Sequence, residues 1–168
     1  PRYATQVKAV YTLDGIAFGF RMEEPAPDAL KADITARDAG LLWHQDCVEI
    51  FLDPTGKNEG EFYQWIISAR PTVYDARNGD TSWDAKGLEI GKHVGEDFWS
   101  MEVYIPFSDL PEVKHAGTGV KWYGQFTRHR IGDSRQSKES IGENQKLNAN
   151  FGGFNNNLAD FAPIRFVE

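Results

Sequence analysis

The sequence is poor in cysteine, and this limits how the chain can be stabilised. Its 168 residues include a single Cys, so no disulfide can form within the chain. A chain of this length buries roughly 70% of its unfolded surface on folding, so neither disulfides nor metals are needed for its stability. We therefore expect one domain spanning residues 1–168 with an ordinary hydrophobic core.

An excess of positive charge is also missing, which excludes two classes of partner. The chain has 18 Lys and Arg against 25 Asp and Glu, a net charge of −7 with His neutral. Nucleic acid and anionic membranes both require a basic patch to neutralise phosphate, so we expect neither to bind. No apolar run approaches the roughly 20 residues of a membrane-spanning helix. A neutral or cationic partner fits this composition better.

No segment keeps the apolar spacing of an amphipathic helix over three turns. Short alternating runs bounded by turn residues recur instead. This pattern predicts an all-β fold, an antiparallel β-sandwich of two sheets with a jelly-roll-like or immunoglobulin-like architecture. We expect strands at 6–13, 16–22, 47–52, 62–68, 88–94, 98–105, 122–128 and 163–167, and a short helical turn near 28–32. Between them, residues 132–157 are rich in Gly, Ser, Asn and Gln and are predicted to form a long loop without regular structure.

Catalytic motifs are nearly absent. The sequence has no Gly-x-Ser-x-Gly, no phosphate-binding Gly loop followed by Lys-Ser/Thr, and no His or Cys spacing typical of zinc. Asp46 and Glu49 lie in a tight apolar context, but three positions apart on a strand they point to opposite faces, which does not suit glycoside hydrolysis. Cys47, beside them, is predicted to be a buried, inert thiol. We expect a protein that is not an enzyme.

Acidic residues in the predicted loops could supply oxygen ligands for calcium. No twelve-residue EF-hand pattern is present, and solvated turn carboxylates are the simpler interpretation. No cofactor is required on these grounds, no metal ligand is assigned, and a structural calcium remains an alternative. The acidic residues concerned are Asp28, Asp33, Asp38, Asp75 and Asp80.

Aromatic residues make up 13% of the chain, and one of them stands apart by its context. Trp65, Trp99 and Trp122 lie within predicted strands, where core packing explains them. Trp43 precedes the strand that begins at Cys47 and is followed by polar residues, so its ring could face solvent with Glu49 close by. An aromatic ring beside a few polar groups suits a sugar, which stacks its apolar face and hydrogen-bonds its hydroxyls. A Trp that covers the edge of the core explains Trp43 equally well.

The run from Leu42 to Pro54, LWHQDCVEIFLDP, resembles the signature of family 9 carbohydrate-binding modules. Further matching segments follow in the family's order and cover nearly the whole chain. They are residues 6–22, 62–65, 73–75, 82–84, 99–107 with Leu110, 122–128 and 160–166. The resemblance implies a non-catalytic β-sandwich module whose partner is a polysaccharide or oligosaccharide. It also implies a linked glycoside hydrolase, a role in polysaccharide degradation, and an extracellular or cell-surface location with any signal peptide removed.

The resemblance also implies a site that holds a terminal sugar between two aromatic rings. Trp43 matches the first ring, Glu49 the carboxylate anchor, and Gln125 and Arg128 match polar positions on the strand that lines the site. No Trp follows Trp122, so the second ring would come from the late loop. The candidates there are Phe151 or Phe154 for the ring and Asn148 as a hydroxyl partner.

The sequence departs from the family at two further points. By the resemblance, Ile66 stands where some members have a site Arg, with Arg70 as its candidate substitute, and we expect the family's N-terminal strand to be lacking or shortened. These departures keep two alternatives open. One is a degenerate structural sandwich without sugar binding, in which Trp43 would be buried. The other is a haem-binding electron-transfer domain that would use Met22 or Met101 with a His as ligands.

Overall fold

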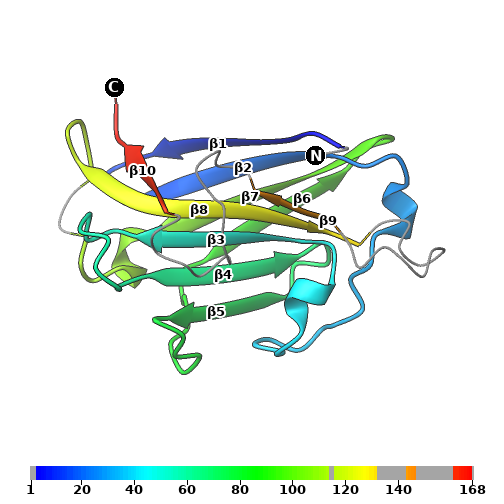
Figure 1. Ribbon diagram of the computed structural model, residues 1–168, viewed down its shortest axis with the longest axis horizontal. Coiled ribbons are helices and arrows are strands. Elements are labelled where there is room, and N and C mark those ends of the chain that lie inside the picture. The colour runs from blue at the N-terminus through cyan, green and yellow to red at the C-terminus, as the bar shows by residue number, and fades with distance from the viewer. Residues whose placement is uncertain (1–2, 114–115, 132–142, 147–160, 168) are drawn as a thin grey trace.

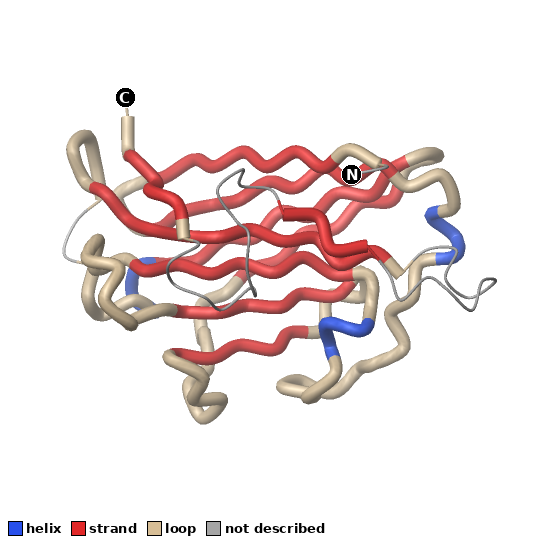
Figure 2. The backbone as a smooth tube through the Cα atoms, in the orientation of Figure 1, coloured by secondary structure: helices blue, strands red, loops and turns tan. Residues whose placement is uncertain are grey.

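The computed structural model describes residues 3–113, 116–131, 143–146 and 161–167. Strands dominate this part of the chain, and the helical segments are three single turns (Figure 2). None of the helices in the described ranges is of a length and apolarity that would let it cross a membrane. The elements in chain order are β1 Thr5–Tyr11, β2 Gly15–Glu23, η1 Pro27–Ala29, η2 Leu42–His44, β3 Cys47–Asp53, β4 Tyr63–Ser68, β5 Val73–Arg77, β6 Glu89–Val94, β7 Phe98–Pro106, η3 Phe107–Asp109, β8 Lys121–Arg130, β9 Glu143–Lys146 and β10 Ala162–Arg165.

Two antiparallel sheets pack face to face, which confirms the predicted β-sandwich (Figure 1). The four-stranded sheet has the order β1-β2-β7-β6, and the six-stranded sheet has the order β10-β8-β3-β4-β5 with β9 also paired to β8. In Figure 1 the six-stranded sheet lies toward the viewer and the four-stranded sheet behind it. β10 pairs with residues 121–124 of β8 and β9 with residues 127–130, so the two short strands share one edge of β8.

The hydrophobic core fills the space between the sheets. Alternation along β2 directs Ile16, Phe18, Phe20 and Met22 into it, because successive side chains of a strand point to opposite faces. β7 contributes Trp99, Met101, Val103 and Ile105 in the same way. Two other Trp residues predicted to be core residues, Trp65 and Trp122, are buried here as well. Apolar burial between the sheets is the main stabilising contribution.

All eight predicted strands are present, with bounds that agree within two residues. Two further strands were missed. β5 is a five-residue edge strand whose sequence, VYDAR, alternates too briefly to stand out. β9 has the sequence ENQK, without a single strong β-former, and lies in the stretch expected to lack regular structure. Its pairing depends on the open edge of β8, which local sequence does not reveal.

A buried ion-pair network links the two sheets at one end of the sandwich. Glu24, directly after β2, accepts hydrogen bonds from Arg130 at 2.8 and 2.9 Å and from Nη2 of Arg128 at 3.3 Å. Both arginines belong to β8, in the other sheet, and all three side chains are at most 5% exposed. The network therefore fixes the end of β8 against the end of β2.

Candidate functional site

The outer face of the six-stranded sheet, the face turned away from the core, carries the sequence motif around Glu49. Val48, Ile50 and Leu52 point into the core between the sheets. Cys47 packs in a second cluster with Leu42 and Ile66, so the alternate residues of β3 face outward as predicted. Every residue of β3 is buried. Both faces of this central strand are therefore buried, and the Glu49 carboxylate lies on the outer one.

Side chains from three adjacent strands form a polar row across this outer face. Gln64 Nε2 on β4 donates a hydrogen bond to Glu49 Oε1 at 2.8 Å. His129 Nε2 on β8 lies 2.9 Å from Glu49 Oε2. In this row, Gln64–Glu49–His129, the two outer side chains hold the Glu49 carboxylate in one orientation from both sides. An oriented carboxylate with amide and imidazole neighbours is a set of groups that recognises hydroxyls rather than apolar surface.

Apolar groups border the polar row at both ends of the strands. At one end, the rings of Phe51, Phe62 and Phe161 lie 5.7 to 6.3 Å apart, centroid to centroid. At the other end, the side chains of Leu42, Cys47 and Ile66 pack together with the partly buried Tyr74 and Ile34. The polar row therefore runs between two apolar patches.

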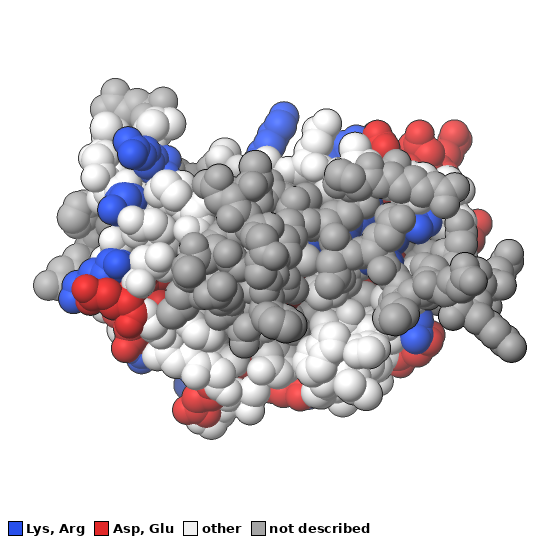
Figure 3. All heavy atoms as spheres, viewed as in Figure 1, with Lys and Arg blue, Asp and Glu red and all other residues white. Residues whose placement is uncertain are grey.

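Trp43 stands at the rim of the second patch. It belongs to η2, which packs against β4, and its neighbour Leu42 is fully buried and anchors the turn. Trp43 itself is 39% exposed. This exposure is what a ligand platform requires, and it speaks against the alternative in which Trp43 is buried in a structural sandwich. Figure 3 views the same side of the molecule, and the acidic side chains that are visible there lie near its edge.

The two candidates on β8 point in opposite directions. Gln125 pairs with Phe51 in the register, so it shares the outer face with Glu49, and it is buried. Arg128 pairs with Val48 and points inward, where it bonds to Glu24 and to Oγ1 of Thr5. The structure thus brings Gln125 to the side of Glu49 but places Arg128 in the ion-pair network between the sheets. The reason is the odd spacing of three residues, which reverses the direction of a side chain on a strand.

The late-loop candidates Asn148, Phe151 and Phe154 lie outside the described residues. Ile66, which takes the place of a site Arg, contributes to the apolar patch beside Trp43. Arg70, its suggested replacement, is exposed beyond the end of β4.

Gln64, His129 and Tyr74 were missed as site residues. His129 lies four residues after Gln125, an even offset that places both on one face once the strand is known to continue to Arg130. Tyr74 pairs with Ile66, which in turn pairs with Glu49. Burial raises the pKa of the Tyr74 phenol, and the carboxylates of Asp38 and Glu49 raise it further. Tyr74 is therefore a second aromatic side chain close to the Glu49 carboxylate, and it remains protonated and able to donate.

Asp46 and Glu49 bond to different partners. Asp46 accepts hydrogen bonds from the backbone N–H groups of Lys31 at 2.7 Å and Ile131 at 2.9 Å, so it fastens two loops to the start of β3. Burial raises the pKa of its carboxyl, against the lowering effect of these two hydrogen bonds. Cys47 is buried, which confirms that part of its prediction, and burial raises the pKa of its thiol well above its ordinary value.

The candidate haem ligands Met22 and Met101 lie in the hydrophobic core. Both are at most 1% exposed, and both pack among the apolar residues between the sheets. A haem group bound by either would have to occupy the space that the core side chains fill. The structure gives this alternative no support.

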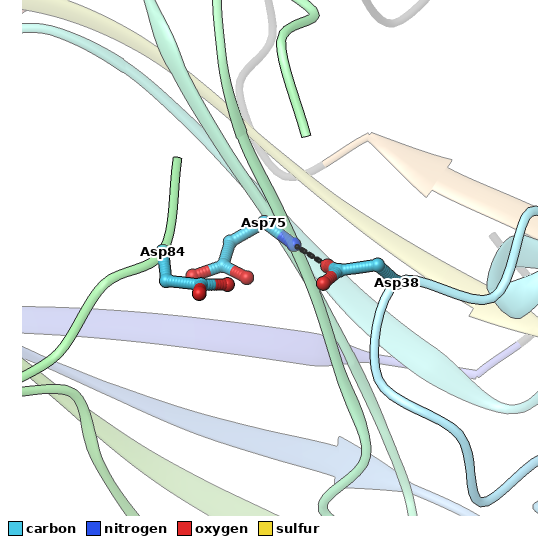
Figure 4. A group of neighbouring side chains, drawn as sticks. All are labelled: Asp38, Asp75 and Asp84. Carbon is cyan, nitrogen blue, oxygen red and sulfur yellow. Dashed lines mark hydrogen bonds between the residues drawn. The ribbon is translucent and has the colours of Figure 1, made fainter. Parts of the chain in front are cut away.

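One group of carboxylates in the described part of the chain is close enough to share a cation. Asp38, Asp75 and Asp84 each bring an oxygen within 4.8 Å of the others, with Asp38 accepting from the backbone N–H of Asp75 (Figure 4). The guanidinium of Arg37 lies among them, with Nη2 at 2.6 and 2.5 Å from the Asp75 oxygens and Nε at 3.0 Å from Asp84. Arg37 therefore supplies the positive charge, and a metal ion would have to displace it.

The cluster contains two of the acidic residues that the sequence suggests as calcium ligands, Asp38 and Asp75. Asp28, Asp33 and Asp80 are not part of it. Asp80 accepts from the N–H of Ser82, which lowers the pKa of its carboxyl. With Arg37 already bonded to two of the three carboxylates, these residues do not fit a calcium ion, and a structural calcium stays a prediction from the sequence alone.

The comparisons with known proteins support the β-sandwich fold described above. No model of a protein family matches the sequence, and no curated protein matches it significantly. Among solved structures, a family 9 carbohydrate-binding module from Caldicellulosiruptor kristjanssonii in complex with glucose aligns over 99% of this chain and 78% of its own length, with a TM-score of 0.70 and 14% identity. The chain has the fold of a family 9 carbohydrate-binding module.

Two further structures show the same likeness. A family 9 module from C. kristjanssonii in complex with cellotriose aligns over 99% of this chain and 76% of its own, with a TM-score of 0.70 and 14% identity. A suspected carbohydrate-binding protein from Bacteroides uniformis aligns over 98% and 79%, with a TM-score of 0.68 and 15% identity. Two of these structural neighbours are thus carbohydrate-binding modules solved with sugars.

Proposed function

We propose that this chain is a non-catalytic carbohydrate-binding module that takes a small saccharide or the end of a glycan chain at the outer face of its six-stranded sheet. The observation that carries the proposal is the row Gln64–Glu49–His129, which lies between apolar patches with the exposed Trp43 at the rim. A sugar ring presents an apolar face and several hydroxyls, and this surface offers a matching group for each. The sugar complexes of two structural neighbours support the choice of ligand class.

Each side chain has a definite part in this proposal. Trp43 stacks on the apolar face of the sugar. The Glu49 carboxylate, oriented by Gln64 and His129, accepts hydrogen bonds from hydroxyls. The phenol of Tyr74 donates to the ligand from the neighbouring strand.

The module's setting is part of the same proposal and rests on the resemblance of the sequence to family 9 modules. We infer that it acts outside the cell, attached to an enzyme that degrades polysaccharide. Binding of the module to a glycan would then keep that enzyme on its substrate.

Calorimetric titration of the full chain with glucose and with cellotriose tests the proposal. We expect saturable binding that Trp43→Ala weakens at least about tenfold, the factor that corresponds to losing one stacked ring. Leu41→Ala is the matched control, because Leu41 is also exposed and lies two positions away. It should leave the affinity unchanged. Failure of both sugars to bind, or equal affinities in the Trp43→Ala variant and the parent chain, would refute the site.

Glu49→Gln tests the polar row separately from the ring. The substitution keeps the size of the side chain but replaces one acceptor oxygen by a donor, so the affinity should fall by roughly tenfold. Thermal unfolding of the same variant checks that it is folded. An unchanged affinity in a folded Glu49→Gln variant would remove Glu49 from the site.

A further inference from the structure

The outer face of the four-stranded sheet lies on the opposite side of the sandwich from Glu49, and it is hollow. A groove of about 460 Å³ crosses this face, and a second hollow of about 710 Å³ continues it. Both are lined by Lys8, Gly19, Gly91 and Glu102, which come from four different strands. The groove therefore spans the sheet from edge to edge.

The strand register explains how the groove forms. Lys8 on β1 pairs with Gly19 on β2, Gly19 with Glu102 on β7, and Glu102 with Gly91 on β6. Long charged side chains thus alternate with glycines across the sheet. A Cβ built on Gly19 would meet no atom within 4 Å, so the floor is open above the backbone at this point.

A second row of paired residues adds hydrogen-bonding groups. Gln6 pairs with Arg21, Arg21 with Ser100, and Ser100 with His93. The Arg21 guanidinium lies 3.5 Å from the centroid of the Phe98 ring, which fixes its plane at the end of the groove. On β7, Tyr104 lies four residues beyond Ser100 and lines the adjoining hollow. Four residues of a strand span about 13 Å, the scale of a short oligosaccharide.

The groove is locally basic on an acidic protein. On the outer face, its lining includes the cations Lys8 and Arg21 against the carboxylate of Glu102, and Glu89 lines the adjoining hollow, while the whole chain has a net charge of −7. Within the described part of the chain, neither Lys8 nor Arg21 is in an ion pair with a carboxylate. Arg37 and Arg130, in contrast, are both bonded to carboxylates. The groove therefore holds positive charge that a ligand can neutralise.

We propose that this groove is a second binding site, which takes an acidic oligosaccharide bearing carboxylates, such as a chain of uronic acid units. Its carboxylates pair with Lys8 and with the fork of Arg21, a geometry suited to a planar anion. Its hydroxyls donate to Glu102, and its rings lie over the glycine floor. A simple inorganic anion would have no use for the acceptor at Glu102, whereas an acidic saccharide has both anionic groups and hydroxyl donors.

Titration of the full chain with trigalacturonate, followed by calorimetry and by amide chemical shifts, tests the proposal. We expect saturable binding with shifts on β2 and β7, and an affinity that falls as salt is raised because the contacts are charged and exposed. Lys8→Gln and Arg21→Gln should each weaken binding about tenfold. Lys86→Gln, which removes the same charge from an exposed residue outside the groove lining, is the control and should not weaken it.

Gly19→Leu tests the groove by filling it. A Cβ at position 19 meets no atom within 4 Å, so we expect the variant to fold and to lose trigalacturonate binding. It should leave cellotriose binding unchanged, and Trp43→Ala should leave trigalacturonate binding unchanged, so the two sites succeed or fail independently. Absence of saturable binding, shifts confined to β3 and β8, or full affinity in the Gly19→Leu and Lys8→Gln variants would overturn the proposal.

Discussion

The two outer faces of the sandwich differ in how their polar groups are used. On the six-stranded sheet, Glu49 is 3% exposed and bonded to side chains from both neighbouring strands. On the four-stranded sheet, Glu102 also lies mid-strand on the outer face, but it is exposed and its register partners are two glycines. The same residue type is thus buried and hydrogen-bonded on one face and exposed on the other. The lesson is that burial, rather than residue type, sets what a carboxylate contributes.

The largest expected contrast is between Glu49→Ala and Glu102→Ala. Removing Glu49 takes away the shared partner of Gln64 and His129 on a buried surface, which should cost about 3 kcal/mol of unfolding free energy. Glu102→Ala should change it by no more than about 0.5 kcal/mol, as is usual at exposed sites. Urea denaturation of both variants measures the difference. Equal costs would show that the two faces are energetically alike.

A smaller contrast is expected for two arginines, one beside each sheet. Arg37→Gln leaves the buried Asp75 without its guanidinium, and we expect a loss of about 2 kcal/mol at pH 7, reduced because Arg37 is itself partly exposed. Arg21→Gln removes an exposed contact with Phe98 and should cost about 0.5 kcal/mol.

The Arg37→Gln loss should also depend on pH. Burial already raises the pKa of the Asp75 carboxyl above its ordinary value, and loss of Arg37 raises it further. A raised folded-state pKa means that the folded state takes up a proton before the unfolded state does as the pH falls. The gap between variant and parent should therefore narrow from pH 7 toward pH 4. A gap that widens over this range would contradict the assignment of Arg37 to Asp75.

Glycines in the two sheets should respond oppositely to alanine. A Cβ on Gly124 of β8 would lie 2.8 Å from the Phe51 carbonyl oxygen and 2.7 Å from Ile164, so Gly124→Ala should destabilise the fold by about 1–2 kcal/mol. Gly19→Ala enters open space in a strand and should stabilise by about 0.5 kcal/mol. Thermal unfolding of the pair measures both, and a shift of the same sign in each would contradict the structure.

The smallest perturbation concerns thiol reactivity rather than stability. Cys47 is fully buried on the six-stranded sheet and burial raises its pKa, so it should react with a thiol reagent only after unfolding. Ser100→Cys places a second thiol on the outer face of the other sheet, where position 100 is partly exposed. Native protein should then incorporate one label per chain. Rapid labelling of Cys47 in the parent protein would show that its surface opens.

Much of the fold could be predicted because strand alternation is local. The hairpin of β1 and β2 is encoded by two alternating runs around Asp14-Gly15, and the direction of the β3 side chains follows from their parity. β9 could not be predicted in this way, because its sequence, ENQK, has no strong β-former and its pairing depends on the open edge of β8. β5 was missed because its five residues alternate too briefly to stand out.

The candidate site, like the fold, could be predicted from the sequence only in part. Trp43 and Glu49 are marked by their place in the motif, whereas His129 and Gln64 belong to the site only because three strands align in register. Arg128 was a candidate as a polar residue on a relevant strand. The register turns it inward to Glu24, which lies in the other sheet.

By itself, the sequence determined the all-β class, eight of the ten strands in the described part of the chain, the outward face of Glu49 and the acidic balance that argues against nucleic acid and anionic membranes. The tertiary structure alone decided which polar groups meet. It joined Glu49 to Gln64 and His129, closed Arg128 and Arg130 onto Glu24, and set Lys8 and Glu102 on either side of Gly19. The physical reason is that alternation depends on neighbouring residues, whereas hydrogen bonds and grooves depend on the register between strands far apart in the chain.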